Sequence, residues 1–135
     1  MVYHPPTSGE ELLARYAAGE RYFVGTHLDH DAVPDGVLDL AGAVLDDANF
    51  SKCWFTARFV GASLRATTFS GANVKSCDFS QADLTDANFC EAAMEATAWV
   101  GATLLRTRFG EVDLYGAVLS EAEFIAMIEN GHDRF

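Results

Sequence analysis

Residues 82–91 read ADLTD followed by ANFCE, two five-residue units with the same arrangement of side chains. Each unit begins with a small residue (Ala82, Ala87), continues with a short polar residue, and has a large apolar residue third (Leu84, Phe89). Two polar residues complete the unit. We call these places the small, polar and bulky positions, followed by two corner positions.

The same order of side chains continues on both sides of this stretch. Every fifth residue from 64 to 124 is large and apolar: Leu64, Phe69, Val74, Phe79, Leu84, Phe89, Met94, Trp99, Leu104, Phe109, Leu114, Leu119 and Phe124. The small position holds Ala, Thr or Cys throughout, except for Val112. A period of five fits neither the 3.6 of an α-helix nor the 2.0 of a continuous strand. It fits a short strand followed by a turn, repeated many times.

A strand and turn repeated in one sense predicts a chain that coils around an axis. Because side chains alternate along a strand, the small and bulky positions point to the same side, which we place inside. Corner pairs such as Ser70-Gly71 and Thr85-Asp86 are residues that favour turns. The small residue is then a steric requirement, since two large groups per unit would overfill a narrow bore.

These units resemble the A(D/N)LXX unit of the pentapeptide repeat proteins, and Ala72-Asn73-Val74 shows the same pattern. The resemblance extends over about three quarters of the chain. It implies an all-β fold, a right-handed quadrilateral parallel β-helix with four units in each coil. The departures are Val112 and the threonines at small positions, and Met94 and Trp99 at bulky positions.

Four units per coil predict which bulky residues stack, once a four-residue step from Phe55 to Phe59 is allowed for. The predicted columns are Leu28, Phe50, Phe69, Phe89 and Phe109; Val33, Phe55, Val74, Met94 and Leu114; Leu40, Phe59, Phe79, Trp99 and Leu119; and Phe23, Leu45, Leu64, Leu84, Leu104 and Phe124. One column is almost entirely phenylalanine, as ring stacking along an axis favours.

The chain divides into a coil and two helical ends. We expect an N-terminal helical cap at 1–20, the β-helix of about five coils at 21–124, and a capping helix and tail at 120–135. Ser8 and Ser120 each begin a capping-box pattern. Within the coil we expect a longer corner near 34–38, at Pro34-Asp35-Gly36, and a local kink at the phase slip near 56–58.

Composition narrows the classes of function. The 135 residues carry 20 Asp and Glu against nine Lys and Arg, a net charge of −11. This charge argues against direct nucleic-acid binding and anionic membranes. No apolar run is long enough to span a bilayer, and the start of the chain does not resemble a secretory signal. Three cysteines cannot all pair, which suits the reducing cytoplasm.

The sequence contains no pattern that predicts catalysis, a metal site or a cofactor. The segment His27-Leu28-Asp29-His30-Asp31 has ligand-type side chains, but its spacing matches no closed zinc site. Cys53 and Cys77 fall at small positions, and Cys90, which points outward, has no neighbouring base or cation. We therefore predict a non-enzyme.

Function is expected on the outer surface. The candidate contact residues are the apolar exceptions among outward positions, two acids, and one residue of the C-terminal helix: Trp54, Val60, Asp78, Asp83, Ala98, Val100, Tyr115, Val118 and Ile125. Val60, Ala98, Val100 and Val118 are predicted to share one face and to form an apolar strip there. Ile125 is predicted to form a homodimer surface at the C-terminal end.

Two functions follow. The first is a non-enzymatic solenoid that binds other proteins. The second comes from the resemblance, because some pentapeptide repeat proteins are rod-shaped dimers that mimic duplex DNA and bind DNA gyrase, giving quinolone tolerance or toxin self-protection. The acidic charge of the repeats, including Asp78 and Asp83, partly fits the second function, but it also has a plain explanation in solubility.

Overall fold

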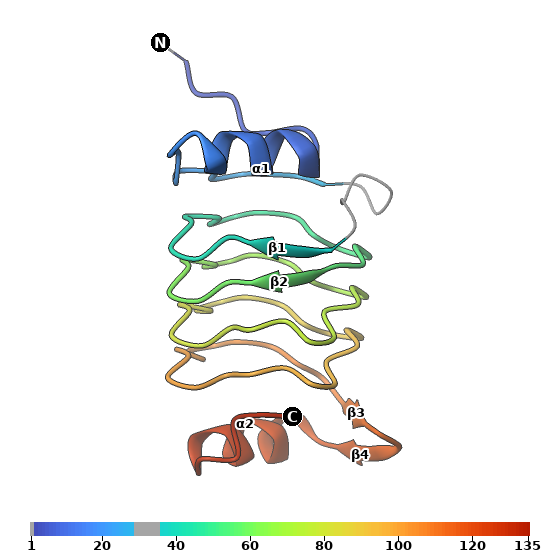
Figure 1. Ribbon diagram of the computed structural model, residues 1–135. Helices are drawn as coiled ribbons and strands as arrows, with labels where there is room; N and C mark the ends of the chain where they lie inside the picture. The colour runs from blue at the N-terminus through green and yellow to red at the C-terminus, as the bar shows by residue number, and fades with distance from the viewer. Residues whose placement is uncertain (1, 29–35) are drawn as a thin grey trace.

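The computed structural model describes residues 2–28 and 36–135, and within them a stack of coils lies between two helices (Figure 1). Helix α1 (Gly9–Ala17) lies at one end and helix α2 (Glu121–Glu129) at the other. Four three-residue strands are present: β1 (Val37–Asp39), β2 (Thr56–Arg58), β3 (Val112–Leu114) and β4 (Ala117–Leu119). None of the described helices is long and apolar enough to cross a membrane.

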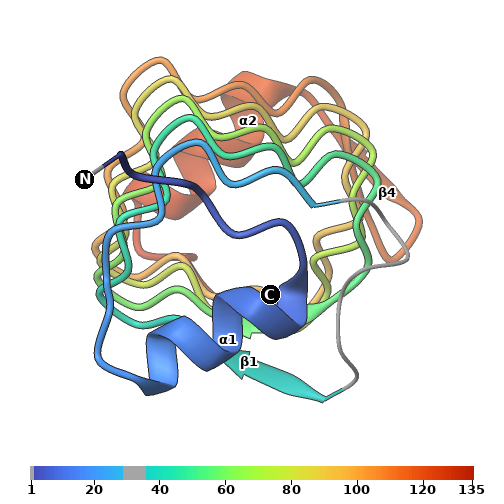
Figure 2. The same cartoon turned by 90° about the horizontal axis from the view of Figure 1, so that it is seen from above.

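Parallel bridges between polar positions join each coil to the next. Asn49 pairs with Thr68, Thr68 with Asn88 and Asn88 with Arg108, so each partner lies four units further along the chain. Three further rows of bridges run along the stack, and the coils superimpose in a four-sided outline when viewed along the axis (Figure 2). We call the strand segment of one unit on one face a rung. Each rung is short because a corner follows it. For the described residues up to Phe109, these bridges confirm the predicted assignment to four columns.

We number the faces by their bulky residues in the last coils. Face 1 carries Phe89 and Phe109, face 2 carries Met94, face 3 carries Trp99 and face 4 carries Leu104.

Aromatic rings fill the bore between face 1 and face 3. On face 1, Phe69 stacks on Phe89 with ring centroids 4.7 Å apart, and Phe89 stacks on Phe109 at 5.4 Å. On face 3, Phe79 stacks on Trp99 at 4.7 Å. The two columns meet edge to face across the bore, as between Phe79 and Phe89 at 5.3 Å and 87°. All five side chains are fully buried, and offset stacks and edge contacts are the favourable aromatic geometries.

The corners depend on left-handed backbone at the last residue of each unit. Asp86 and Glu91 both have φ of 63°, and Gly71 has φ of 67°. Ala87 N–H then bonds back to Leu84 C=O at 2.9 Å, which closes the turn. Since L-residues enter this region at a cost, Gly, Asp and other unbranched residues occupy these places.

The four-residue step from Phe55 to Phe59 removes one such corner. Strand β2 runs through it and pairs in parallel with β1, Val37 opposite Thr56 and Asp39 opposite Arg58. The sequence predicted a kink here, whereas the structure has a short strand, because the omitted residue is the left-handed one. Ala57 N–H donates to the Cys77 thiol at 3.3 Å, so this backbone donor within the four-residue step is hydrogen-bonded.

The first coil is longer than the others. Tyr22 pairs with Val44 and His27 with Asn49, whereas in the next coil Val44 already pairs with Ser63, a partner closer to it in sequence. Residues 34 and 35 of the corner predicted at 34–38 lie outside the described part, as does the predicted column residue Val33. Residues 37 and 38 of that predicted corner are instead part of strand β1.

The coil ends before residue 112, earlier than the sequence predicted. Strands β3 and β4 form an antiparallel hairpin, with Val112 opposite Leu119 and Leu114 opposite Ala117. The sequence had placed Leu114 and Leu119 in the parallel coil. Tyr115 and Gly116 both have a positive φ, and two successive left-handed residues suit a tight hairpin turn. Val112, the one bulky residue at a small position, begins this change of direction.

Phe124 is likewise not a rung of the coil. It lies in α2, is fully buried, and contacts Trp99 and Phe109 edge to face at 5.9 and 4.9 Å. Helix α2 begins with a complete capping box between Ser120 and Glu123, which satisfies two backbone donors at its start. At α1 only half of the expected box forms: Ser8 accepts from Glu11 N–H, but the Glu11 carboxylate accepts from Thr7 N–H.

On two faces of the last coil, the backbone groups at the open edge form hydrogen bonds with residues that the five-residue period did not predict there. On face 1 the Glu121 carboxylate accepts from Phe109 N–H at 2.7 Å and Gly110 N–H at 3.1 Å. On face 3 the chain returns, so that Trp99 N–H bonds to Asp133 C=O and Phe135 N–H to Thr97 C=O. This terminal rung is antiparallel, with Ala98 opposite Arg134.

Candidate protein-interaction surface

The acids and amides at polar positions hold the corners of the coil. The Asp78 carboxylate accepts from Ser80 N–H at 2.9 Å, and that of Asp83 from Thr85 N–H at 3.1 Å. Asn73 and Asn88 make the same bond to the residue two places on. This is the side-chain turn that Asp and Asn form readily. The recurrence of Asp or Asn was the sequence signal for it.

Asp78 and Asp83 were predicted from the sequence to be contact residues. Their carboxylates also stabilise the corners of the coil. Both are only half-exposed. The structure does not bring them together with the exposed apolar candidates.

Ion pairs between neighbouring coils offset part of the acidic charge. Within the described residues, Arg58 lies 3.1 Å from Asp39, Arg65 3.9 Å from Asp83, and Lys75 3.8 Å from Glu95. On face 4 the Arg106 guanidinium approaches the Asp86 carboxylate to 2.6 Å. That hydrogen bond lowers the pKa of Asp86. These four pairs neutralise only part of the acidic charge on the coil.

Trp54 is the most prominent apolar group on the coil. Its side chain is 75% exposed, on face 2, above the short side chains of Asn73 and Ala93 in the same row. Val37 is 67% exposed and pairs with Thr56, two residues after Trp54. Val37 therefore lies at the corner that follows Trp54, between face 2 and face 3, and we call these two residues the Trp54 corner. Trp54 was predictable from the sequence and Val37 was not, because the neighbour of Val37 in the stack depends on the register of β1 with β2.

The apolar strip predicted on face 3 is interrupted. Val60, Ser80 and Val100 occupy the same place on successive coils, where their carbonyls accept from Gly42, Gly61 and Gln81 N–H. Ser80 separates the two valines, which are half-buried like Ala98.

Val118 is not part of that strip. It lies in β4, opposite Asp113 and outside the coil, because the hairpin replaces the rung on which the sequence had placed it.

The C-terminal candidates lie on different elements. Tyr115 and Val118 are 73% and 61% exposed on the hairpin that projects from the stack (Figure 1). The Tyr115 hydroxyl donates to Phe135 C=O at 3.1 Å, which ties the hairpin to the chain end. Ile125 is half-buried against the core.

The described residues bring no metal-ligating side chains together in a cluster. His27 is exposed on face 1 in the row of Asn49, and the remaining ligand-type residues of that segment, Asp29, His30 and Asp31, lie outside the described part. Burial raises the pKa of the Cys77 thiol to about 12, so at neutral pH it is a protonated, unreactive group.

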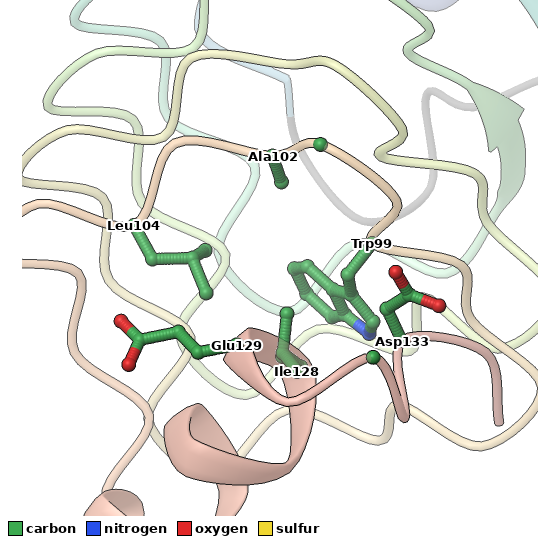
Figure 3. A pocket seen from close by; sticks show the side chains of 8 residues that line it. Trp99, Ala102, Leu104, Ile128, Glu129 and Asp133 are labelled. Carbon is green, nitrogen blue, oxygen red and sulfur yellow. The ribbon is translucent and has the colours of Figure 1, made fainter.

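A hollow of about 300 Å³ lies between the last coil and the end of α2 (Figure 3). Gly101, Ala102 and Leu104 border it from the coil, and Ile128 and Glu129 from the helix. Trp99, Gly131 and Asp133 complete the border. The sequence did not predict this hollow, because it forms where the helix leaves the coil.

Residues 57–95 match the family model for pentapeptide repeats, in eight copies. These are the repeats that the five-residue units resemble, and the chain carries them over this segment. No curated protein matches the sequence.

Several solved structures are similar. A pentapeptide repeat protein (Rfr23) from the cyanobacterium Cyanothece 51142 is 18% identical, with 80% of this chain and 97% of that chain covered and a TM-score of 0.40. A second, alr5209 from Nostoc PCC 7120, is 24% identical over 83% of this chain and 84% of that one, with a TM-score of 0.31. QnrB1, a plasmid-mediated fluoroquinolone resistance protein, is 19% identical over 70% and 72%, with a TM-score of 0.21. Scores this low support no inference about function.

Proposed function

We propose that this chain is a right-handed, four-sided β-solenoid that acts as a non-enzymatic protein-binding module, with helical caps at both ends. The observation that carries the proposal is the Trp54 corner. A rigid coil holds an indole and an isopropyl group in water beside a face of short side chains. Exposed apolar groups of this size mark contact sites, and tryptophan is enriched among residues that dominate binding energy.

The interior leaves no room for chemistry between the described coils. Rings and aliphatic groups fill the bore, and the threonine hydroxyls at small positions donate to main-chain carbonyls, such as Thr67 to Leu45 and Thr107 to Leu84. These groups are satisfied structural ones. The outer surface is therefore where we place the function.

The test is affinity capture from the source organism with the purified chain as bait. Proteins held through the Trp54 corner are expected to be retained by the native chain and lost with Trp54→Ser. Tyr22→Ser is the matched control, because Tyr22 is also exposed but lies on face 4. Capture of the same proteins by Trp54→Ser would contradict the proposal.

An acidic DNA mimic that binds gyrase is the alternative, supported by the net charge of −11. The pairing of Asp83 with Arg65 and of Asp86 with Arg106 weakens it. A supercoiling assay tests it with Asp78→Asn combined with Asp83→Asn, since asparagine keeps the corner hydrogen bond and removes the charge. Inhibition of gyrase by the native chain that this pair abolishes would favour the mimic. No effect of the native chain at micromolar concentration would exclude it.

A further inference from the structure

The edge of the last coil on face 4 is a rung without a neighbour. One coil earlier, Gln81, Leu84 and Asp86 donate their N–H groups to Val100, Thr103 and Leu105 of the coil that follows, at 2.8 to 2.9 Å. In return, Thr103 N–H donates to Ala82 C=O at 2.9 Å. Four backbone bonds thus join these two coils along face 4 and its flanking corners.

The corresponding groups of the last coil have no such partner. Within residues 2–28 and 36–135, the N–H groups of Gly101, Leu104 and Arg106 and the carbonyl of Ala102 make no hydrogen bond. Face 1 and face 3 are closed by Glu121 and by the terminal rung, as described above. Thr103 and Leu105 of this edge remain exposed, Leu105 at 56%.

The missing rung coincides with the hollow. Gly101, Ala102 and Leu104 carry three of the four unpaired groups, and together with Trp99 they border the hollow on the coil side (Figure 3). Leu104 and Ile128 supply apolar walls on its two sides. The space therefore lies beside hydrogen-bonding groups that repeat the pattern of a filled rung.

We propose that an extended, basic segment of a partner protein fills this place as an added parallel β-strand. Strand addition satisfies the edge groups of the last coil, and side chains at alternate positions supply specificity. By analogy with the coil, the segment carries a small residue beside Ala102 and an aliphatic residue beside Leu104. This inference rests on the proposed function only in taking a protein as partner, because it uses a different surface from the Trp54 corner.

Besides a small and an aliphatic residue, the partner segment is expected to carry positive charge. Glu129 and Asp133 border the hollow, and within the described residues neither carboxylate has an ion-pair partner. Lys or Arg at the outward positions of the segment would lie against them. The expected motif is a small residue, a basic residue and an aliphatic residue in succession, with basic residues around them.

The test uses the full chain and a synthetic peptide, acetyl-KGAKLKS-amide, followed by amide NMR. We expect saturable shifts at Gly101, Leu104 and Arg106, with slower hydrogen exchange at the same amides. A peptide with proline in place of the central lysine cannot donate to Ala102 C=O and is expected to bind about tenfold more weakly. Glu129→Lys should weaken binding several-fold, while Glu91→Lys, exposed on the far corner of face 1, should not.

Two results would overturn the proposal. One is the absence of saturable shifts at millimolar peptide, or equal binding of the proline peptide. The other is a concentration-dependent shift of the same amides without peptide, accompanied by a dimer in sedimentation, which would make a second copy of this chain the occupant. Either result removes this site and leaves the capture test at Trp54 unaffected.

Discussion

The same five-residue pattern forms different structures in the middle coils and at the C-terminal end of this molecule. From residue 44 to 109 each bulky residue occupies a place set by its number, and the polar positions up to Asn88 pair with the next coil. From residue 112 the five-residue pattern continues in the sequence, but the chain forms a hairpin, a helix and an antiparallel return. The five-residue repeat thus predicts the structure only where a following coil is present to pair with it.

The largest expected effect breaks the middle of the stack. Phe89→Asp places a carboxylate between Phe69 and Phe109 with no cation near it. An unpaired buried charge costs at least several kcal/mol, comparable with the whole stability of a domain, so the variant should not fold. Circular dichroism and size-exclusion chromatography measure this. Asn88→Asp, one residue away at a polar position, is the control and should remain folded.

A smaller effect is expected at the other end. Deleting residues 133–135 removes the terminal rung on face 3 and the ring of Phe135, which lies 5.2 Å from that of Phe124. The loss of two backbone hydrogen bonds and of the bond from the Tyr115 hydroxyl to Phe135 C=O, with partial exposure of an aromatic contact, should cost about 2–4 kcal/mol in the free energy of unfolding. Urea unfolding measures it. Trp99 should become more solvated, which shifts its fluorescence to the red in a Trp54→Phe background; an unchanged spectrum would contradict this role.

Variants of Glu121 test whether a side chain can replace the hydrogen bonds that a following coil would make. Its bonds to Phe109 N–H and then Gly110 N–H lower the pKa of this carboxyl in the folded state. Glu121→Ala should lower the free energy of unfolding by about 1–2 kcal/mol at neutral pH, and Glu121→Gln by less, because an acceptor remains.

The pH dependence has a defined sign. A carboxyl whose folded pKa is depressed stabilises the fold above its unfolded pKa, and the contribution is lost as the pH falls through the folded value. Glu123, whose pKa is lowered by its bond to Ser120 N–H, behaves alike. The cost of Glu121→Ala should therefore diminish as the pH falls below about 4. Identical costs at pH 7 and pH 3 would show that the charge is immaterial.

The smallest effect separates charge from hydrogen bonding at a corner. Asp78→Asn keeps an oxygen for Ser80 N–H and should leave the free energy of unfolding almost unchanged. Asp78→Ala removes that acceptor and should cost about 1 kcal/mol. Thermal unfolding of both variants measures the difference. Equal losses would mean that the carboxylate acts through its charge.

The aromatic columns were predictable, and the candidate surface largely was not. Phe69, Phe79 and Phe89 needed only the count of four units per coil. Val37, by contrast, lies outside the periodic region, so the Trp54 corner required the register of β1 on β2. The hollow at Leu104 required the position of α2 relative to the last coil, which the five-residue period does not specify.

Spacing alone determined the inside and the outside of this protein. A small and a bulky residue two places apart must share a side of a strand, and repetition every five residues must bring like places together. Tertiary structure alone decided where the coil stops, since Leu114, Leu119 and Phe124 satisfy the pattern yet lie in other elements. The physical reason is that the last coil has no following neighbour, so its backbone groups take whatever partner the remaining chain supplies.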